Sequence, residues 1–359
     1  VNKADIIYPI HVRNWMKKLH SHFLNNNFEN VIIDPSTQRL SYVAFANTKG
    51  LVELPYAPEK GVISLEYLNN PQRRKEYIDK WYDTVSIGKK LILPYHYISN
   101  TDYPVEKIDD WIKMNIQLID ESIQVVEEGK EKYAMISIGL SHLVFQADKI
   151  LSYFVHAEVD GFIVQVSDMK QLNEQSLKSY LDFMLNLQKY TNKPVIALKV
   201  PVALGLTLVA KGIHGFSLGL ASIDYFDEQY IKEEKDSFNL YSKFYFPKVM
   251  SLMSYPKKDT FVFEQLYNYF GGCNCKWCKD KTAIEIGTGD NGIQLHHWQM
   301  MLEEVNKLNQ YEGESRIVYL KKRIEVALET LDSIPKEIIN SQKNTEYYKL
   351  LKNLKKVIY

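Results

Sequence analysis

The chain has 359 residues, and its 44 basic and 44 acidic side chains cancel. This balance excludes a globally basic nucleic-acid binder, so any charged binding surface must be local. Apolar residues make up 45% of the chain and aromatic residues 13%, which excludes a disordered polypeptide. A chain of this length can form two average domains, or one barrel domain with an appendage.

The sequence contains no membrane-spanning pattern. No apolar run approaches the roughly 20 residues that cross a bilayer. The first residues, VNKADIIYPIHVRNW, lack the apolar centre of an export signal. We therefore expect no membrane segment and a cytoplasmic location, where thiols stay reduced.

Short apolar runs alternate with longer amphipathic segments from residue 30 onward. This alternation favours a parallel sheet, and about eight such units over ~250 residues fit an α/β fold of the (β/α)8 TIM type. A doubly wound open sheet is the alternative, although no GxGxxG follows the first strand. Strands are predicted at 30–37, 61–67, 90–99, 133–140, 160–168, 194–200, 214–220 and, more weakly, 246–254, with helical segments such as 105–129 and 174–191 between them.

Reacting groups of such barrels lie at the C-terminal ends of the strands. Asp34 ends an apolar strand and opens the loop DPSTQ, where it can equally be a turn former. Asp168 has the same two interpretations, and His96 in PYHY can also be a core residue. The strand-end rule selects Asp34, His96, Ser141, His142, Asp168, Lys199 and Ser217.

All three cysteines lie in the decapeptide GGCNCKWCKD, at Cys273, Cys275 and Cys278. Thiolates at C-x-C-x-x-C spacing can bind one soft cation, and zinc takes four Cys or His ligands. We predict a structural Zn²⁺ with His296 as the fourth ligand, narrowly preferred over His297 on the first turn of a predicted helix. The alternatives are thiols without metal, or an iron–sulfur cluster, which would lack one ligand.

The C-terminal region is predicted to be helical at 294–310, 314–333 and 341–357. We predict three parts: a barrel over 1–260, a zinc-binding segment with its helix over 261–310, and a helical extension over 311–359. Lysines in this region can neutralise phosphates, or they can form an ordinary solvated helix face. They are Lys276, Lys279, Lys281, Lys321, Lys322, Lys349, Lys352, Lys355 and Lys356, with Arg323 beside them.

A predicted barrel followed by C-x-C-x-x-C and a histidine resembles the tRNA-guanine transglycosylases and their DNA-modifying relatives. NVIIDPSTQRL resembles the strand before the family's Asp-Ser-Gly-Gly-Phe-Gln loop, which matches Asp34 to a catalytic Asp. TDYPVEK resembles the segment TPYPA, DGFIVQVSD a strand reading GYAIGG, and AKGIHGFSLGL the stretch ARGIDMFDCV. The resemblance covers most of residues 30–310.

The resemblance implies exchange of a guanine for a 7-deazaguanine base in DNA or tRNA, through a covalent glycosyl-enzyme and two carboxylates. It implies that Asp34 transfers protons. Ser217 stands where the family has its nucleophilic Asp, so Asp168, Asp224 or Asp227 is expected to replace it. Gln165 begins a pair that replaces the family's Gly-Gly. The expected substrate-binding residues are Tyr95, His96, Gln165 and Ser217, with the aromatic rings around an extruded base.

Two further hypotheses belong to other classes. The barrel can be a non-catalytic subunit that binds nucleic acid or a protein partner, because Ser217 removes the expected nucleophile. It can also be a small-molecule enzyme with a structural zinc. The resemblance implies a nucleic-acid partner and pairing through the zinc region, as a homodimer or a heteromer.

Overall fold

The computed structural model forms two compact units. The first unit comprises Val1–Asp168, Asp182–Ile196 and Asp227–Lys235, and the second comprises Met169–Leu181, Ala197–Phe226 and Asp236–Tyr359. The structure describes residues 5–13, 16–42, 50–59, 61–99, 105–169, 172–217, 226–228, 241–257, 259–288, 290–335 and 342–358. The predicted part boundaries at 260 and 310 stay predictions.

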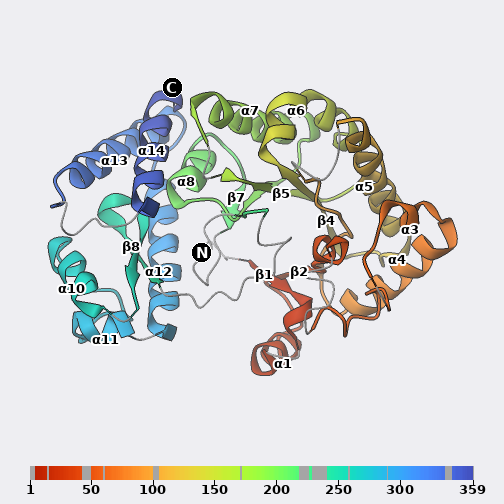
Figure 1. The fold of residues 1–359 in the computed structure, drawn as a ribbon, viewed down its shortest axis with the longest axis horizontal. Coiled ribbons are helices and arrows are strands. Elements are labelled where there is room, and N and C mark those ends of the chain that lie inside the picture. The colour runs from red at the N-terminus through yellow and green to blue at the C-terminus, as the bar shows by residue number, and fades with distance from the viewer. Residues whose placement is uncertain are drawn as a thin grey trace. The chain divides into compact units, whose positions relative to one another are not determined.

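A seven-stranded parallel sheet, curled like half of a barrel, organises the α/β part of the chain (Figure 1). Its strand order follows the chain from β1 to β7, and each of the first four strands pairs in parallel with the next. The strands are β1 (Ile6–Pro9), β2 (Val31–Asp34), β3 (Lys90–Ile92), β4 (Glu131–Gly139), β5 (Gly161–Ser167), β6 (Val195–Leu198) and β7 (Gly215–Ser217). The predicted parallel sheet is confirmed, and a closed eight-stranded barrel is not seen among the described residues.

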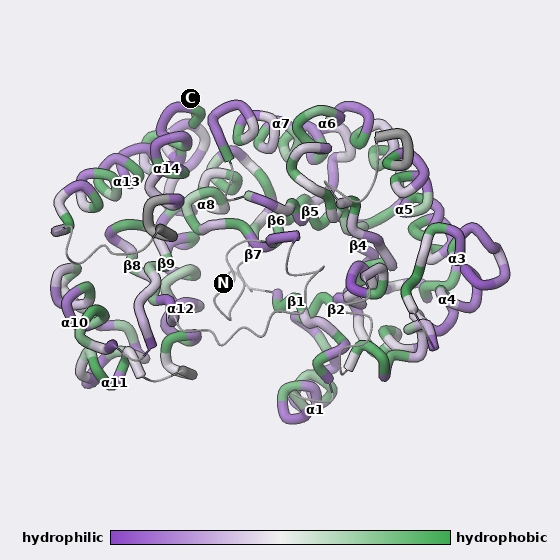
Figure 2. The backbone as a smooth tube through the Cα atoms, in the orientation of Figure 1, coloured by the Kyte–Doolittle hydropathy of each residue, from purple (hydrophilic) through white to green (hydrophobic). Residues whose placement is uncertain are grey.

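Helices follow the strands, as the alternating pattern predicted. Those of the first unit line the outer side of the curled sheet (Figure 1). α8 is mostly apolar and all of its residues are buried (Figure 2). The helices of this part of the chain are α1 (Lys17–Asn25), α3 (Leu65–Asn69), α4 (Pro71–Val85), α5 (Val105–Val125), α6 (Leu140–Phe154), α7 (Glu174–Thr191) and α8 (Val202–Ala210), with 3-10 turns at η1 (Ile10–Val12) and η2 (Thr37–Ser41).

One predicted strand is wrong, and part of a second lies in a different sheet. Residues 61–67 contain the start of α3, because the Ser64 side chain accepts the Tyr67 N–H at 3.1 Å and caps a helix there. Residues 246–254 do not form an eighth barrel strand. They turn between β8 (Tyr241–Phe246) and β9 (Ser251–Pro256), an antiparallel hairpin of the second unit with the 3-10 turn η4 (Pro247–Val249) at its tip. The short strand β1 was not predicted, since IIYP is only four residues long.

In the described part of the second unit, five helices follow the β8–β9 hairpin in the chain, in addition to α8 and the first residues of α7. α13 and α14 match the predicted helices at 314–333 and 341–357, and both alternate polar and apolar residues along their length (Figure 2). Among the described residues, no helix combines the length and apolar character that a bilayer span requires. The five helices are α10 (Thr260–Tyr269), α11 (Ala283–Thr288), α12 (Asp290–Leu308), α13 (Glu314–Asp332) and α14 (Gln342–Val357).

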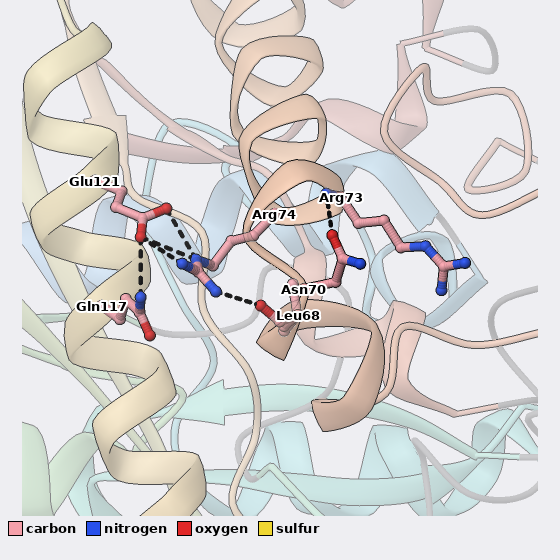
Figure 3. A network of polar contacts seen from close by, with 6 residues as sticks. All are labelled: Leu68, Asn70, Arg73, Arg74, Gln117 and Glu121. Atoms are coloured by element: carbon pink, nitrogen blue, oxygen red, sulfur yellow. Dashed lines mark hydrogen bonds and ion pairs between the residues drawn. The ribbon is translucent and has the colours of Figure 1, made fainter.

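A buried guanidinium joins two outer helices of the first unit (Figure 3). Arg74 of α4 donates from Nε and Nη2 to the Glu121 carboxylate of α5, at 2.8–3.0 Å. Its Nη1 donates to the Leu68 carbonyl, which ends α3. Gln117, one turn before Glu121, donates to the same carboxylate at 3.0 Å. Three helices are thus held together by one charged side chain.

Replacing Glu121 with alanine is expected to lower the free energy of unfolding by about 2–3 kcal/mol, because Arg74 is left buried without its carboxylate. The effect stays below that of a fully buried pair, since the Glu121 side chain is 36% exposed. The matched control is Gln117→Ala, which removes a neighbour that only donates and is expected to cost about 0.5 kcal/mol or less. Urea unfolding of the two variants measures the difference, and equal losses would contradict the assignment.

Candidate functional site

Three cysteines and one histidine of the second unit converge on one point. The ligand atoms of Cys273, Cys275, Cys278 and His296 all lie within 4.8 Å of one another. The His296 Nδ1 atom is 3.5, 3.4 and 3.5 Å from the three sulfur atoms in that order. The cluster is compatible with a metal site, and it unites the four residues that the sequence predicted as ligands.

The backbone of β8 decides which of the two adjacent histidines faces the cysteines. Tyr245 accepts the His296 Nε2–H at its carbonyl, at 2.9 Å, and this bond leaves Nδ1 as the ring's acceptor. The Tyr245 N–H donates to His297 Nε2 at 3.2 Å, so His297 is turned away into a structural bond. The His296 ring also stacks on Phe244, with centroids 4.0 Å apart. The preference for His296 over His297 is therefore supported by geometry.

The cysteine loop is held by α10. The Tyr267 hydroxyl accepts the Cys273 N–H at 2.9 Å and donates to the Cys273 carbonyl at 3.1 Å. The Cys278 thiol donates toward the Cys273 sulfur and lowers the pKa of Cys273 to about 4. The Cys273 sulfur in turn raises the pKa of Cys278, together with burial. Three sulfur atoms this close together cannot all ionise on their own, because their negative charges repel one another. A bound cation removes this repulsion and allows each thiol to lose its proton.

Asp34 ends β2 in the first unit and is buried, with 7% of its surface exposed. Its Oδ1 atom accepts the Ser36 N–H at 2.7 Å and the Tyr95 hydroxyl at 3.1 Å. The charge of Asp34 also opposes the effect of burial, which lowers the pKa of the Arg39 guanidinium. A backbone donor, a hydroxyl donor and a nearby cation all favour the ionised form of this carboxyl group.

The loop after Asp34 is built as a fixed turn. Ser36 adopts a left-handed backbone, with φ of 56°. Its hydroxyl bonds His11 Nδ1 at 2.9 Å, and the Pro35 carbonyl accepts the Tyr56 hydroxyl at 2.7 Å. The carboxylate therefore forms the turn and also bonds a tyrosine of the next strand end, and its catalytic role stays a prediction.

The residues after β3 point in alternating directions. Tyr95 bonds Asp34, and Tyr97 bonds Ser167 at 2.8 Å. His96 points instead toward α5, where its ring packs on Trp111 with centroids 5.1 Å apart and its backbone exchanges two bonds with the Asn115 side chain. The His96 ring is fully buried, which is the core position that the sequence left open as an alternative.

Burial lowers the pKa of His96 to about 3, and its Nε2 atom has no partner among the described residues. The unfolded chain binds this proton below a pKa of about 6.5, so the neutral folded ring loses stability as pH falls from that value toward the folded pKa. We expect the free energy of unfolding to fall more steeply with acidification in the wild type than in His96→Gln. His156, which is exposed, supplies the control His156→Gln, whose slope should match the wild type. Equal slopes in all three proteins would contradict the prediction.

A second carboxylate cluster lies at the ends of β3 and β5. Asp168 follows β5 with a left-handed backbone, φ 59°, and its Oδ2 atom accepts the Ser167 hydroxyl at 2.7 Å. Ser167 contacts the Tyr97 hydroxyl, which also contacts Glu228 Oε2 at 3.0 Å. Ser99 donates to the other oxygen of Glu228. Sequence reasoning missed Glu228, because it lies beyond β7 and follows no apolar run.

The remaining predicted residues lie in several places. Gln165 is buried on β5 and accepts the Ser137 hydroxyl of β4 at 3.1 Å. It lies two residues before Ser167 on the same strand, so both side chains face the same side of the sheet. Ser217 is the last residue of β7 in the second unit, and its carbonyl accepts the Val200 N–H at 3.4 Å. Asp224 lies outside the described residues.

The lysines of α14 have partners nearby. Lys355 pairs with Glu325 at 3.3 Å and Lys356 with Glu174 at 3.1 Å. Lys352 lies over the Tyr348 ring, 4.2 Å from its centroid. These contacts agree with a solvated, internally paired helix face, and a phosphate-binding role for α14 stays a prediction.

Comparison with protein-family models and with curated proteins gives no match for this chain. Fold and site therefore define a coarse class: an α/β chain with a curled parallel sheet, carboxylates at the C-terminal ends of two strands, and a Cys3His cluster compatible with a metal ion.

Proposed function

We propose that the chain is a divergent transglycosylase that exchanges a guanine for a 7-deazaguanine base in nucleic acid, DNA or tRNA. The observation that carries this proposal is the pair of carboxylates Asp34 and Asp168, which follow from strands β2 and β5 at the same edge of one parallel sheet. Glycosyl exchange with retention needs two carboxyl groups, one ionised and one that transfers a proton. The proposal includes closure of the sheet into a full barrel.

The surroundings of Asp34 and Asp168 favour a different role for each carboxyl group in the exchange. Asp34 is held as an anion by Ser36, Tyr95 and Arg39, so it attacks the ribose C1′ atom while the bond from C1′ to the base nitrogen breaks. Asp168 gives a proton to the departing guanine and takes one from the entering base, whose nitrogen then displaces Asp34 from C1′. This division reverses the one that the resemblance alone implies, and it does not require a carboxylate at Ser217.

The metal in this proposal is zinc. Zn–S bonds near 2.3 Å and Zn–N bonds near 2.0–2.1 Å at tetrahedral angles place the nitrogen about 3.6 Å from each sulfur. The His296 Nδ1 atom lies 3.4–3.5 Å from the three sulfur atoms. Four protein ligands leave no open position, so the zinc stabilises the second unit and takes no part in the exchange.

The test is a base-exchange assay. Purified protein is incubated with radiolabelled guanine, or with the deazaguanine precursor preQ0, together with tRNA or double-stranded DNA, and the label in the polymer is counted. Incorporation supports the proposal and identifies the polymer. If neither polymer takes up label while the zinc is present at one ion per chain and nucleic acid binds, the proposal is overturned in favour of a non-catalytic subunit.

A further inference from the structure

Four side chains of the first unit form a continuous chain of oxygen contacts between two carboxyl groups. Glu228 Oε2 lies 3.0 Å from the Tyr97 hydroxyl, which lies 2.8 Å from Ser167 Oγ, which lies 2.7 Å from Asp168 Oδ2. The residues come from segments far apart in the sequence, since Tyr97 and Glu228 are separated by 131 positions. Glu228 is buried, with 6% of its surface exposed, whereas Asp168 is partly exposed.

The three contacts between these four side chains require three protons. Each of the three oxygen–oxygen contacts is a hydrogen bond only if one proton lies in it. Tyr97 and Ser167 supply one hydroxyl proton each, and an ionised carboxylate supplies none. Burial raises the pKa of Tyr97, so its phenol keeps its proton. The third proton must therefore belong to one of the two carboxyl groups.

The third proton is more stable on Glu228, the buried carboxyl group, than on Asp168. An ionised carboxylate loses more solvation at the buried Glu228 than at the partly exposed Asp168. Ser99 donates to Glu228 Oε1, so Oε2 is the oxygen that carries the proton toward Tyr97. The Ser99 carbonyl is itself fixed by the His142 Nε2–H at 2.6 Å, which holds this end of the chain in place.

We infer that Glu228, Tyr97, Ser167 and Asp168 form a proton relay, in which Glu228 stores a proton and Asp168 delivers it to a ligand at the strand ends. In one shift, the Glu228 proton moves to Tyr97, the Tyr97 proton to Ser167 and the Ser167 proton to Asp168 Oδ2. Both hydroxyls end neutral, Glu228 becomes the anion and Asp168 the acid. All three hydrogen bonds persist with their directions reversed.

The relay deepens the proposed function and rests on it only for the identity of the proton acceptor. A departing base needs a proton and an entering base must lose one, so Asp168 must be protonated before the first step and returns its proton to Glu228 after the second. Because Glu228 holds a proton at the other end of the relay, Asp168 can be protonated without a water molecule in the site. Glu228 touches no base in this scheme and acts through Asp168.

Glu228→Gln is the variant that tests the relay. The glutamine amide accepts from Ser99 with its oxygen and donates to Tyr97 with its nitrogen, so it satisfies both contacts and mimics the protonated acid. We expect an unchanged thermal midpoint. The infrared spectrum of the wild type at neutral pH should contain the carbonyl stretch of a protonated carboxylic acid that shifts when glutamate carboxyl carbons are labelled with 13C. In the difference spectrum, this signal should be lost in Glu228→Gln and kept in Glu76→Gln, an exposed control on α4.

The infrared result stands apart from the base-exchange assay. Loss of the labelled signal in Glu228→Gln supports the relay even if the wild type exchanges no base, an outcome in which only the proposed function fails. A signal that persists in Glu228→Gln, or disappears only in Asp168→Asn, overturns the inference. Where exchange is measurable, Tyr97→Phe should lower kcat by about 100-fold with KM little changed, because it interrupts proton transfer without removing either carboxyl group.

Discussion

Replacing Cys275 with serine is expected to abolish metal binding and to unfold the second unit. Cys275 is buried, with 6% of its surface exposed, and lies 3.4 Å from the shared His296 Nδ1 atom. Structural zinc sites contribute roughly 10–16 kcal/mol of apparent binding free energy in small metal-dependent folds, which equals or exceeds the ~5–15 kcal/mol stability of a typical domain. The zinc content should fall from one ion per chain to near zero, and the cooperative thermal transition of this unit should be lost.

Metal analysis and thermal circular dichroism measure both effects, and a chelator added to the wild type should reproduce them. His297→Gln is the matched control, because glutamine can still accept the Tyr245 N–H and the residue is not a ligand in this geometry. It should keep its zinc, whereas His296→Gln should not. Full zinc occupancy in Cys275→Ser, or loss of zinc only in the His297 variant, would show that the ligand set is wrong.

Asp34→Asn is expected to reduce base incorporation by about 10³-fold or more, because an amide cannot form the covalent bond to C1′. The asparagine oxygen can still accept the Ser36 N–H and the Tyr95 hydroxyl, so folding should be preserved. A wild-type sample incubated with nucleic acid and no entering base should contain a complex that survives denaturation. The Asp34 variant should contain none.

The control for this experiment is Asp160→Asn. Asp160 precedes β5, at the amino end of the sheet, where it is exposed and accepts the Lys132 N–H at 2.7 Å. Its replacement should leave incorporation unchanged. If Asp34→Asn retains wild-type incorporation, Asp34 is only a turn former and the nucleophile must be sought elsewhere.

Local patterns were sufficient for the metal cluster and for most of the sheet. Three cysteines within six positions define most of a ligand set without knowledge of the fold, and the apolar runs at 133–140 and 160–168 became β4 and β5. The pattern failed at 61–67, where the apolar pair Val62 and Ile63 is followed by the Ser64 cap, and the start of a helix overrides strand propensity.

Glu228 illustrates what a linear pattern does not contain. Its partners Tyr97 and Ser99 lie about 130 residues earlier, and only the folded chain brings them together. The orientation of His96 had the same cause. A histidine between two tyrosines has no local signal for its direction, and the packing of Trp111 and Asn115 on α5 decided it.

Ser36 after β2, Asp168 after β5 and Lys199 after β6 adopt left-handed backbones at the C-terminal ends of parallel strands without being glycine, with φ of 56°, 59° and 56°. An L-residue in this region costs roughly 1–2 kcal/mol, and glycine would relieve most of that. A library selected only for heat resistance should therefore accumulate glycine at these positions. A library selected for turnover should keep Asp168 despite the cost, so sequencing the two populations would separate residues retained for chemistry from those retained for shape.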